Sequence, residues 1–332
     1  MVNDMSQLMT SAAPHVHSGD SVQKNMLLVI LALLPAFAVS LVAFGWGALI
    51  TTAISIVACL LTEWCITKYM LKQQPSLLDL SAVLTGLLLA MNLPSNLPWW
   101  MTVLGAVFAI GIGKMAFGGI GQNVFNPALV GRVFLLISFP AAMTTWPVAK
   151  GFATGYLDAE TAATPLSYMK HAVIEGDQFE LGSFLDSFLS CVPEHIMGGS
   201  MGEISALALL IGGIFLICTR VISWHIPVSI LGTVAVFTAI LSACGIGSGP
   251  MTHLLTGGLM LGAIFMATDY VTSPMTAWGK IIFGVGIGVI VVVIRTWGAY
   301  PEGMSFAILI MNACVPLLNR IAPKRFGEVV KK

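Results

Sequence analysis

The chain has 332 residues, of which 57% are hydrophobic and only 9% are charged, and its formal net charge is zero. A soluble domain carries about a quarter charged residues, so this composition excludes an ordinary soluble protein and predicts an integral membrane protein. The balanced charge indicates no nucleic-acid partner. The six cysteines are scattered without a C-x-x-C pair, which disfavours an iron–sulfur cluster held by this chain alone.

Ten apolar segments are candidates to cross the bilayer, because a span needs about 20 residues and fewer when it is buried inside a bundle. The third, fourth and fifth segments are short and bounded by glycine or proline, which suits a bundle interior or a broken helix. The polar stretch before the first segment lacks the pattern of a signal peptide. The segments cover approximately residues 25–44, 46–67, 78–93, 98–113, 126–142, 204–220, 226–244, 252–268, 279–295 and 303–319.

The distribution of lysine and arginine predicts the orientation, since these residues concentrate on the cytoplasmic side of a membrane. With a cytoplasmic N-terminus, ten spans return the C-terminus to the same side, and most basic residues then lie inside. We therefore expect a cytoplasmic tail (1–24), a first five-helix half (25–142), an outer loop (143–203), a second five-helix half (204–319) and a basic cytoplasmic tail (320–332).

The two halves carry sequence echoes that predict a repeat. The sequence LTG at 84–86 recurs at 255–257, and FG at 117–118 precedes Gln122 by the same interval at which WG at 297–298 precedes Glu302. Because each half has an odd number of spans, the halves have opposite topology. We predict an all-α polytopic membrane protein of about ten transmembrane helices in two inverted five-helix repeats, with related pockets near the two membrane faces.

The segment 113–128, GKMAFGGIGQNVFNPA, contains too many glycines for a helix. Glycines such as Gly118 and Gly119 let irregular backbone approach a flat ligand closely, and Asn123 supplies donors and acceptors. Pro127 suits the first turn of the next helix. A mobile turn between helices is the alternative. Irregular backbone at membrane depth is tolerated where it is buried or lines a cavity, which favours a ligand site.

A second polar motif, ATDYVTSP at 267–274, ends an apolar span at the same inner face. Exposing the Asp269 side chain to lipid there would cost free energy. Helix capping by Thr272 and Ser273 is the simpler interpretation. The presence of two such motifs at one face favours a shared ligand pocket.

The outer face carries two further features. Arg295 departs from the positive-inside trend, so its side chain either extends to the lipid headgroups, pairs with Glu302, or binds a phosphate. The outer loop contains the sequence TAATP at 161–165, in which Pro165 biases Thr164 towards extended backbone and an outward-facing hydroxyl. By its residue chemistry alone, this segment is typical of an ordinary surface loop. No Ser-His-Asp set or metal-binding cluster is present, so we expect no catalytic residue and no metal site in this chain.

Taken together, these motifs resemble the D subunit of the Rnf complex, an ion-pumping ferredoxin:NAD oxidoreductase, and its homologue, the B subunit of the sodium-pumping NADH:quinone oxidoreductase. The resemblance covers nearly the whole chain. It rests on FGG-x-G-x-N-x-FNPA at 117–128, ATD-x-VTSP at 267–274, PEG-x-x-x-AIL at 301–309 and the threonine segment. The absence of a long N-terminal extension favours the Rnf subunit over the quinone-reducing one.

The resemblance implies a flavin carried by this chain. Members of the family attach FMN through its phosphate to the last threonine of a Ser/Thr-Gly-Ala-Thr motif, which corresponds to Thr164 here, with Thr161 at the first position and Ala162 in place of the usual glycine. It also implies that Arg295, Glu302 and Gly303 lie near this flavin. The inner pocket is then expected to hold a second, noncovalent flavin, as riboflavin is held in the quinone-reducing relative. We expect this pocket to be built from Lys114, Phe117, Gly118, Gly119, Asn123, Asp269, Thr272 and Ser273.

The same resemblance implies partners and a location. The chain would be an electron-transfer subunit, not catalytic alone, in the lipid bilayer of a bacterial or archaeal cytoplasmic membrane, and electron flow would drive Na⁺ or H⁺ transport. Other Rnf subunits would supply iron–sulfur and FMN carriers and would bind ferredoxin and NAD. Three alternatives are the B subunit of the sodium-pumping quinone reductase, a secondary transporter or channel with no flavin, and an anchor for other redox subunits.

Overall fold

The computed structural model describes most of the chain. The described residues are 21–72, 77–149, 151–153, 155–157, 161–162, 164, 166–167, 169–170, 199–246, 248–300 and 302–320. Most of the expected N-terminal tail, the end of the C-terminal tail and a large part of the outer loop lie outside these residues.

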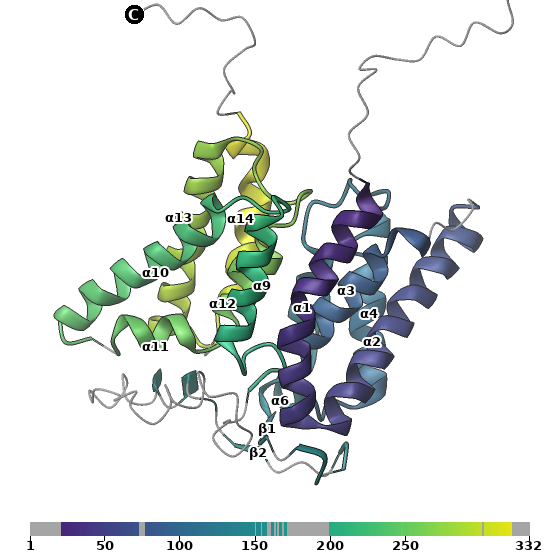
Figure 1. The fold of residues 1–332 in the computed structure, drawn as a ribbon, viewed down its shortest axis with the longest axis horizontal. Helices are drawn as coiled ribbons and strands as arrows, with labels where there is room; N and C mark the ends of the chain where they lie inside the picture. Colours follow the sequence, from purple (N-terminus) through teal and green to yellow (C-terminus); the bar gives the residue numbers. More distant parts are fainter. Residues whose placement is uncertain are drawn as a thin grey trace, which may run out of the picture.

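The first half is a set of apolar helices that follow the predicted spans (Figure 1). Asn126 caps α5 by accepting the backbone N–H groups of Ala128 and Leu129, and Pro127 occupies the first helical position, as predicted. The predicted fifth span is interrupted, because Pro140 begins a separate short helix. The helices are α1 (Val22–Phe44), α2 (Trp46–Cys65, extended by a π-helical turn to Met70), α3 (Ser81–Met91), α4 (Trp99–Gly111), α5 (Pro127–Ser138) and α6 (Pro140–Thr144).

The second half is also a set of apolar helices, and one of its predicted spans is interrupted. The predicted span 252–268 is broken after α11, where Gly257 has a positive φ of 70° that glycine tolerates readily. The chain then continues as α12 and the π-helical turn η7. The elements are α9 (Ala206–Cys218), α10 (His225–Ala243), α11 (Pro250–Leu255), α12 (Leu259–Leu261), η7 (Gly262–Met266), α13 (Ala277–Trp297) and α14 (Met304–Leu318).

The fold is that of a polytopic helical membrane protein, as predicted. Five of the described helices are long and apolar enough to cross a bilayer, and four shorter apolar helices accompany them. In the part of the chain that the structure describes, the only sheet is a two-residue antiparallel pair, in which β1 (Trp146–Pro147) faces β2 (Thr161–Ala162).

Corresponding helices make corresponding contacts in the two halves. In the first half α2 packs against α3 and α4, and α4 packs against α5; in the second half α10 packs against α11 and α13, and α13 packs against α14. The halves meet where α1 packs along α9. The start of α1 and the end of α14 lie at one end of the bundle, and β1 and β2 lie at the other end (Figure 1). We call these the terminal end and the loop end.

The contact between α1 and α9 depends on Gly212. A Cβ atom at this position would overlap the backbone carbonyl oxygen of Ala32 on α1. Without a hydrophobic driving force between helices in lipid, small residues that permit close approach are a principal source of helix association.

We therefore expect Gly212→Val to lower the free energy of unfolding in detergent by about 1–3 kcal/mol, because the backbone of α1 cannot move aside without separating the halves. The matched control is Gly232→Val on α10, where a Cβ atom would meet nothing within 4 Å. Thermal unfolding of both variants gives the comparison. Equal midpoints for the two variants would contradict the packing described for α1 and α9.

Candidate functional site

A buried ion pair joins the two halves near the loop end of the bundle. Arg132 on α5 pairs through Nη2 with Glu302, which lies just before α14, and donates through Nη1 to Asn92 Oδ1 at 2.7 Å. The side chains of Arg132 and Glu302 are only 6% and 12% exposed. The second oxygen of Glu302 accepts the backbone N–H of Gly258. The pair therefore ties α5 and the end of α3 to the broken span and to α14.

Arg295 lies in the same cluster but binds differently. Its Nη1 donates to the carbonyl oxygen of His253 at 2.6 Å and its Nη2 to that of Thr256 at 2.9 Å. The side chain is almost completely buried. Arg295 thus satisfies the carbonyl groups at the end of α11, where the helix breaks, and Glu302 takes its direct ion pair from Arg132 instead.

Glu203 is the fourth charged residue of this cluster. It lies in the turn before α9, is 9% exposed, and its Oε1 has no hydrogen-bond partner. Burial raises the pKa of Glu203 to about 7; Glu302 adds to the rise, while Arg132 and Arg295 oppose it. Glu302 behaves in the opposite way: burial alone would raise its pKa, but Arg132, Arg295 and the Gly258 N–H outweigh burial and lower it. We refer to Arg132, Glu203, Arg295 and Glu302 as the outer charge cluster, after the face at which the sequence predicts Arg295 to lie.

Thr164 is buried in a turn whose Leu166 side chain reaches this cluster at Gly257. It is 5% exposed, its hydroxyl lies 3.0 Å from Ser167 Oγ, and Oγ1 accepts the Ser167 backbone N–H at 3.2 Å. The expected outward-facing hydroxyl is therefore wrong, because the hydroxyl caps the turn that follows it. A Cβ atom on Gly257 would lie 2.8 Å from Arg295 Nη2 and 3.3 Å from Leu166 Cδ2, so the Thr164 turn packs on the residues that hold Arg295.

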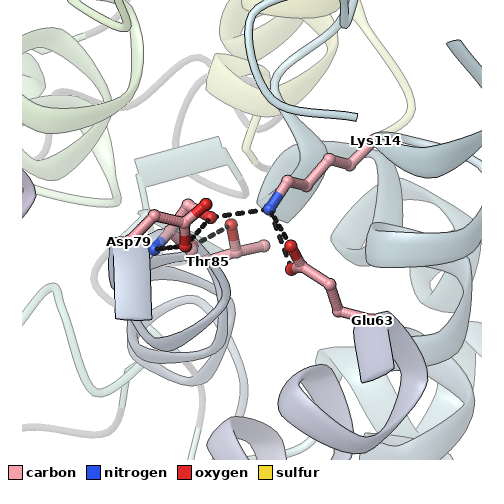
Figure 2. A network of polar contacts seen from close by, with 5 residues as sticks. Glu63, Asp79, Thr85 and Lys114 are labelled. Atoms are coloured by element: carbon pink, nitrogen blue, oxygen red, sulfur yellow. Dashed lines mark hydrogen bonds and ion pairs between the residues drawn. The ribbon is translucent and has the colours of Figure 1, made fainter. Parts of the chain in front are cut away.

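A second charged network lies toward the terminal end, where α2 and α4 end and α3 begins. Figure 2 shows this network from close by. Lys114 Nζ is 2.8 Å from both carboxylate oxygens of Glu63 and 2.6 Å from Ser81 Oγ. Ser81 donates through its hydroxyl to Asp79 Oδ1 at 2.8 Å, and its backbone carbonyl accepts the Thr85 hydroxyl at 2.9 Å. These contacts bind the glycine-rich segment to α2 and to the start of α3.

A cavity with about 810 Å³ of empty space, part of it open to the outside, lies beside this network. Both halves line it, because its walls include residues of α1, α3, α9 and the segment after η7. The polar lining includes Lys114, Asn123 and Asp269, and burial raises the pKa of Asp269 against the effect of hydrogen bonds from Val271 and Thr272. Most of the remaining lining is apolar, as in typical sites for flat organic ligands.

A line of polar contacts connects the two regions through the middle of the bundle. The side-chain amide nitrogen of Asn92 lies 3.6 Å from Met266 Sδ, and Asn126 Nδ2 donates to the Met266 carbonyl oxygen at 3.1 Å. The amide of Asn312 on α14 lies 3.2 Å from Asn126 N and 3.1 Å from the Thr272 carbonyl oxygen. Thr272 in turn donates to Asp269 Oδ2 at 3.2 Å. Thus α3 and η7 end against each other, and their polar ends are satisfied across the two halves.

The structure brings together part of each predicted residue set. At the loop end, Arg295 and Glu302 lie at Gly257, where Leu166 of the Thr164 turn also packs; Gly303 is buried against Ile294, and Thr161 is exposed on β2. Of the predicted inner set, Lys114, Asn123 and Asp269 line the cavity. The other members lie nearby along the chain but not among the lining residues: Phe117, Gly118, Gly119, Thr272 and Ser273.

Sequence reasoning missed Arg132, Asn92 and Glu203 as members of the outer site. An arginine inside an apolar span is rare and almost always faces the bundle interior, so Arg132 did carry a usable signal. Asn92 and Glu203 carried none, because their role depends on contacts with residues far away in the sequence. Segment 113–128 is irregular as predicted, with positive φ at Gly118, Gly119 and Gly121.

We expect Arg132→Gln to lower the free energy of unfolding by about 3–5 kcal/mol, because it leaves the buried carboxylate of Glu302 without its partner. The double variant Arg132→Gln with Glu302→Gln should lose less than the sum of the two single variants. Arg220→Gln, at an exposed arginine, is the control and should change stability by less than about 0.5 kcal/mol. Denaturant titration in detergent measures all four variants. A strictly additive double variant would show that the two side chains are not coupled.

Comparison with known proteins identifies the family. The profile of the NQR2, RnfD, RnfE family matches residues 9–327. The chain is 46% identical over 327 residues to the D subunit of the Na⁺-translocating ferredoxin:NAD⁺ oxidoreductase complex of Acetobacterium woodii, covering 98% of this chain and 96% of the relative. It is 43% identical to the D subunit of the ion-translocating oxidoreductase complex of Stutzerimonas stutzeri, covering 93% of both. It is also 43% identical to the D subunit of the proton-translocating ferredoxin:NAD⁺ oxidoreductase complex of Clostridium ljungdahlii, covering 96% of this chain and 95% of the relative. The chain therefore belongs to the NQR2, RnfD, RnfE family.

Proposed function

We propose that this chain is the D subunit of an Rnf-type ion-translocating oxidoreductase complex, and that it carries FMN covalently on Thr164. Its near-full-length similarity to the D subunits of such complexes supports the first part. The observation that carries the second part is the buried position of Thr164 in a turn whose Leu166 side chain packs at Gly257, next to Arg295. The relatives at 46% and 43% identity include one named for Na⁺ and one named for protons, so both cations are compatible with this fold.

The residues around Thr164 fit a phosphate ester. Two arginines lie in the cluster, and both Arg132 Nε and Arg295 Nε are buried without a hydrogen-bond partner. Arginine is well suited to phosphate, because its planar guanidinium group presents several donors and stays charged. When bound, the flavin supplies one-electron and two-electron chemistry. The chain's own contributions are the hydroxyl that forms the ester, the positive charges beside it and a packed environment that excludes water.

A noncovalent flavin in the cavity at the terminal end is the second part of the proposal. The cavity has apolar walls for a ring system, and Asn123 and Asp269 among its polar residues can bond to ring or ribityl groups. Lys114 is engaged with Glu63 and Ser81, so its role would be to hold the cavity wall.

Electrons entering or leaving these flavins require carriers on other subunits. The hydrocarbon core of a bilayer is about 30 Å thick. Among the described residues, no group of three or more histidine, cysteine or acidic side chains is arranged to hold a metal ion. We therefore assign iron–sulfur carriers, ferredoxin docking and NAD binding to partner subunits of the complex.

We expect Thr164→Ala to abolish the in-gel flavin fluorescence of the denatured chain when the protein is produced with its native flavin-attaching enzyme, because the ester oxygen is gone. Ser167→Ala is the matched control: it removes the neighbouring hydroxyl but keeps the acceptor, so the fluorescence should persist. Mass spectrometry of the intact chain should show added FMN in the wild type. A wild-type chain without that mass would refute the covalent flavin and would favour a transporter without a chromophore.

The Thr164→Ala variant lacks the covalent flavin, so it allows the second flavin to be tested separately. Acid extraction should still release riboflavin or FMN from it, and the additional change Val29→Trp, which fills the cavity, should abolish that release. An extract without flavin from Thr164→Ala would remove the cavity from the proposal while leaving Thr164 unaffected.

We further propose that the terminal end faces the cytoplasm and the loop end faces outward, as the distribution of lysine and arginine suggests. In a background without native cysteines, Leu157→Cys at the loop end should react with an impermeant thiol reagent in intact cells. Met275→Cys, before α13 and 86% exposed, should react only after permeabilisation. The reverse labelling pattern would invert the orientation.

A further inference from the structure

The outer charge cluster contains one acid that is held differently from the rest. Glu302 is fixed by Arg132 and by the Gly258 N–H, and the guanidinium groups of Arg132 and Arg295 are fixed by Asn92 and by two backbone carbonyl groups. Glu203 makes no salt bridge with either arginine, and its buried Oε1 is left without a partner. A buried carboxylate in this condition is the group of the cluster that is most easily protonated.

The charge balance of the cluster explains what such an acid can do. Two guanidinium groups and two ionised carboxylates sum to zero, and the phosphodiester of an FMN on Thr164 would add one negative charge in both redox states. Reduction of the flavin would add a further negative charge near Arg295, which is costly in a medium of low dielectric constant. Protonation of Glu203 offsets that further charge without breaking the ion pair that joins the halves.

The Thr164 turn packs on the same segment as Arg295. Leu166 and Arg295 Nη2 both contact the position of Gly257, and Lys170 donates to the carbonyl oxygen of Gly298, three residues after Arg295. The charged groups that face Glu203 from the surrounding elements are Arg132 on α5, Arg295 on α13 and Glu302 before α14.

We propose that Glu203 binds a proton when the group attached to Thr164 gains negative charge, and so acts as the proton acceptor coupled to reduction of that flavin. This inference rests on the proposed function. One electron from the reductant enters the flavin, and one proton from the aqueous phase forms the O–H bond on the Glu203 carboxylate, so the cluster and flavin together keep their charge. Glu203 is a positioning residue in this scheme, because it acts on the flavin through the field of the cluster.

The test is the reduced-minus-oxidised infrared difference spectrum of the intact complex, with dithionite as reductant. Reduction of the wild type should produce a carboxylic acid C=O band. Glu203→Gln should lose this band, Glu203→Asp should shift it, and Thr164→Ala should lose it while keeping the Glu203 side chain. A band that persists unchanged in Glu203→Gln would overturn the inference even though Thr164-dependent fluorescence is present. Absence of that fluorescence from the wild type would instead remove the proposed function, and this inference with it.

Stability provides a second measurement with a defined sign. The folded-state pKa of Glu203 is raised to about 7, so its stabilising contribution is complete below the unfolded pKa of about 4.3 and is lost as the pH rises through about 7. The thermal midpoint of the wild type should therefore fall between pH 5 and pH 8 relative to that of Glu203→Gln. Reduction of the attached FMN should move this fall to higher pH. A fall at the same pH in the oxidised and the reduced wild type would contradict the coupling between Glu203 and the attached group.

Discussion

The ion pair between Arg132 and Glu302 is the contact on which the arrangement of the two halves depends. Two charges taken out of water gain stability only when their mutual geometry is good and their remaining polar atoms are bonded. Here Asn92 bonds the arginine and the Gly258 N–H bonds the carboxylate. The pair therefore fixes four separate segments at once: the end of α3, α5, the break after α11 and the start of α14. The position of Arg295, and through it the Thr164 turn, follows from that fixed break.

The helix breaks on the two sides of the bundle have a common cause. A span that stops short leaves carbonyl and N–H groups unbonded in a region without water, so each break needs polar partners from elsewhere in the protein. Arg295 supplies donors for the carbonyl groups at the end of α11, and Asn126 supplies one for Met266 at the end of η7. Polar residues in this membrane protein are thus concentrated where helices end, and the two candidate sites lie at those places.

Much of the fold follows from local sequence, and much of the site does not. Apolar runs predicted the helices, because each run carries its own signal over about 20 residues. Asn126 and Pro127 predicted the start of α5 for the same local reason. The partner of Glu302 could not be predicted in this way, since Arg132 lies 170 residues earlier in the chain. The direction of the Thr164 hydroxyl was predicted wrongly, because the hydroxyl oxygen accepts the Ser167 N–H of the turn that follows, a contact that the backbone bias imposed by Pro165 does not specify.

The short helix α3 also determines where polar groups lie within the transmembrane electric field. Eleven residues of helix extend about 16 Å, which is roughly half of the hydrocarbon core. Because α3 and η7 approach from opposite sides and end against each other at Asn92 and Met266, polar groups reach the centre of the bundle from both faces. A charge that moved past this point would cross part of the transmembrane voltage, which is worth about 2.3 kcal/mol per elementary charge at 100 mV. The side-chain amide of Asn92 is therefore a polar group placed where such a charge would pass.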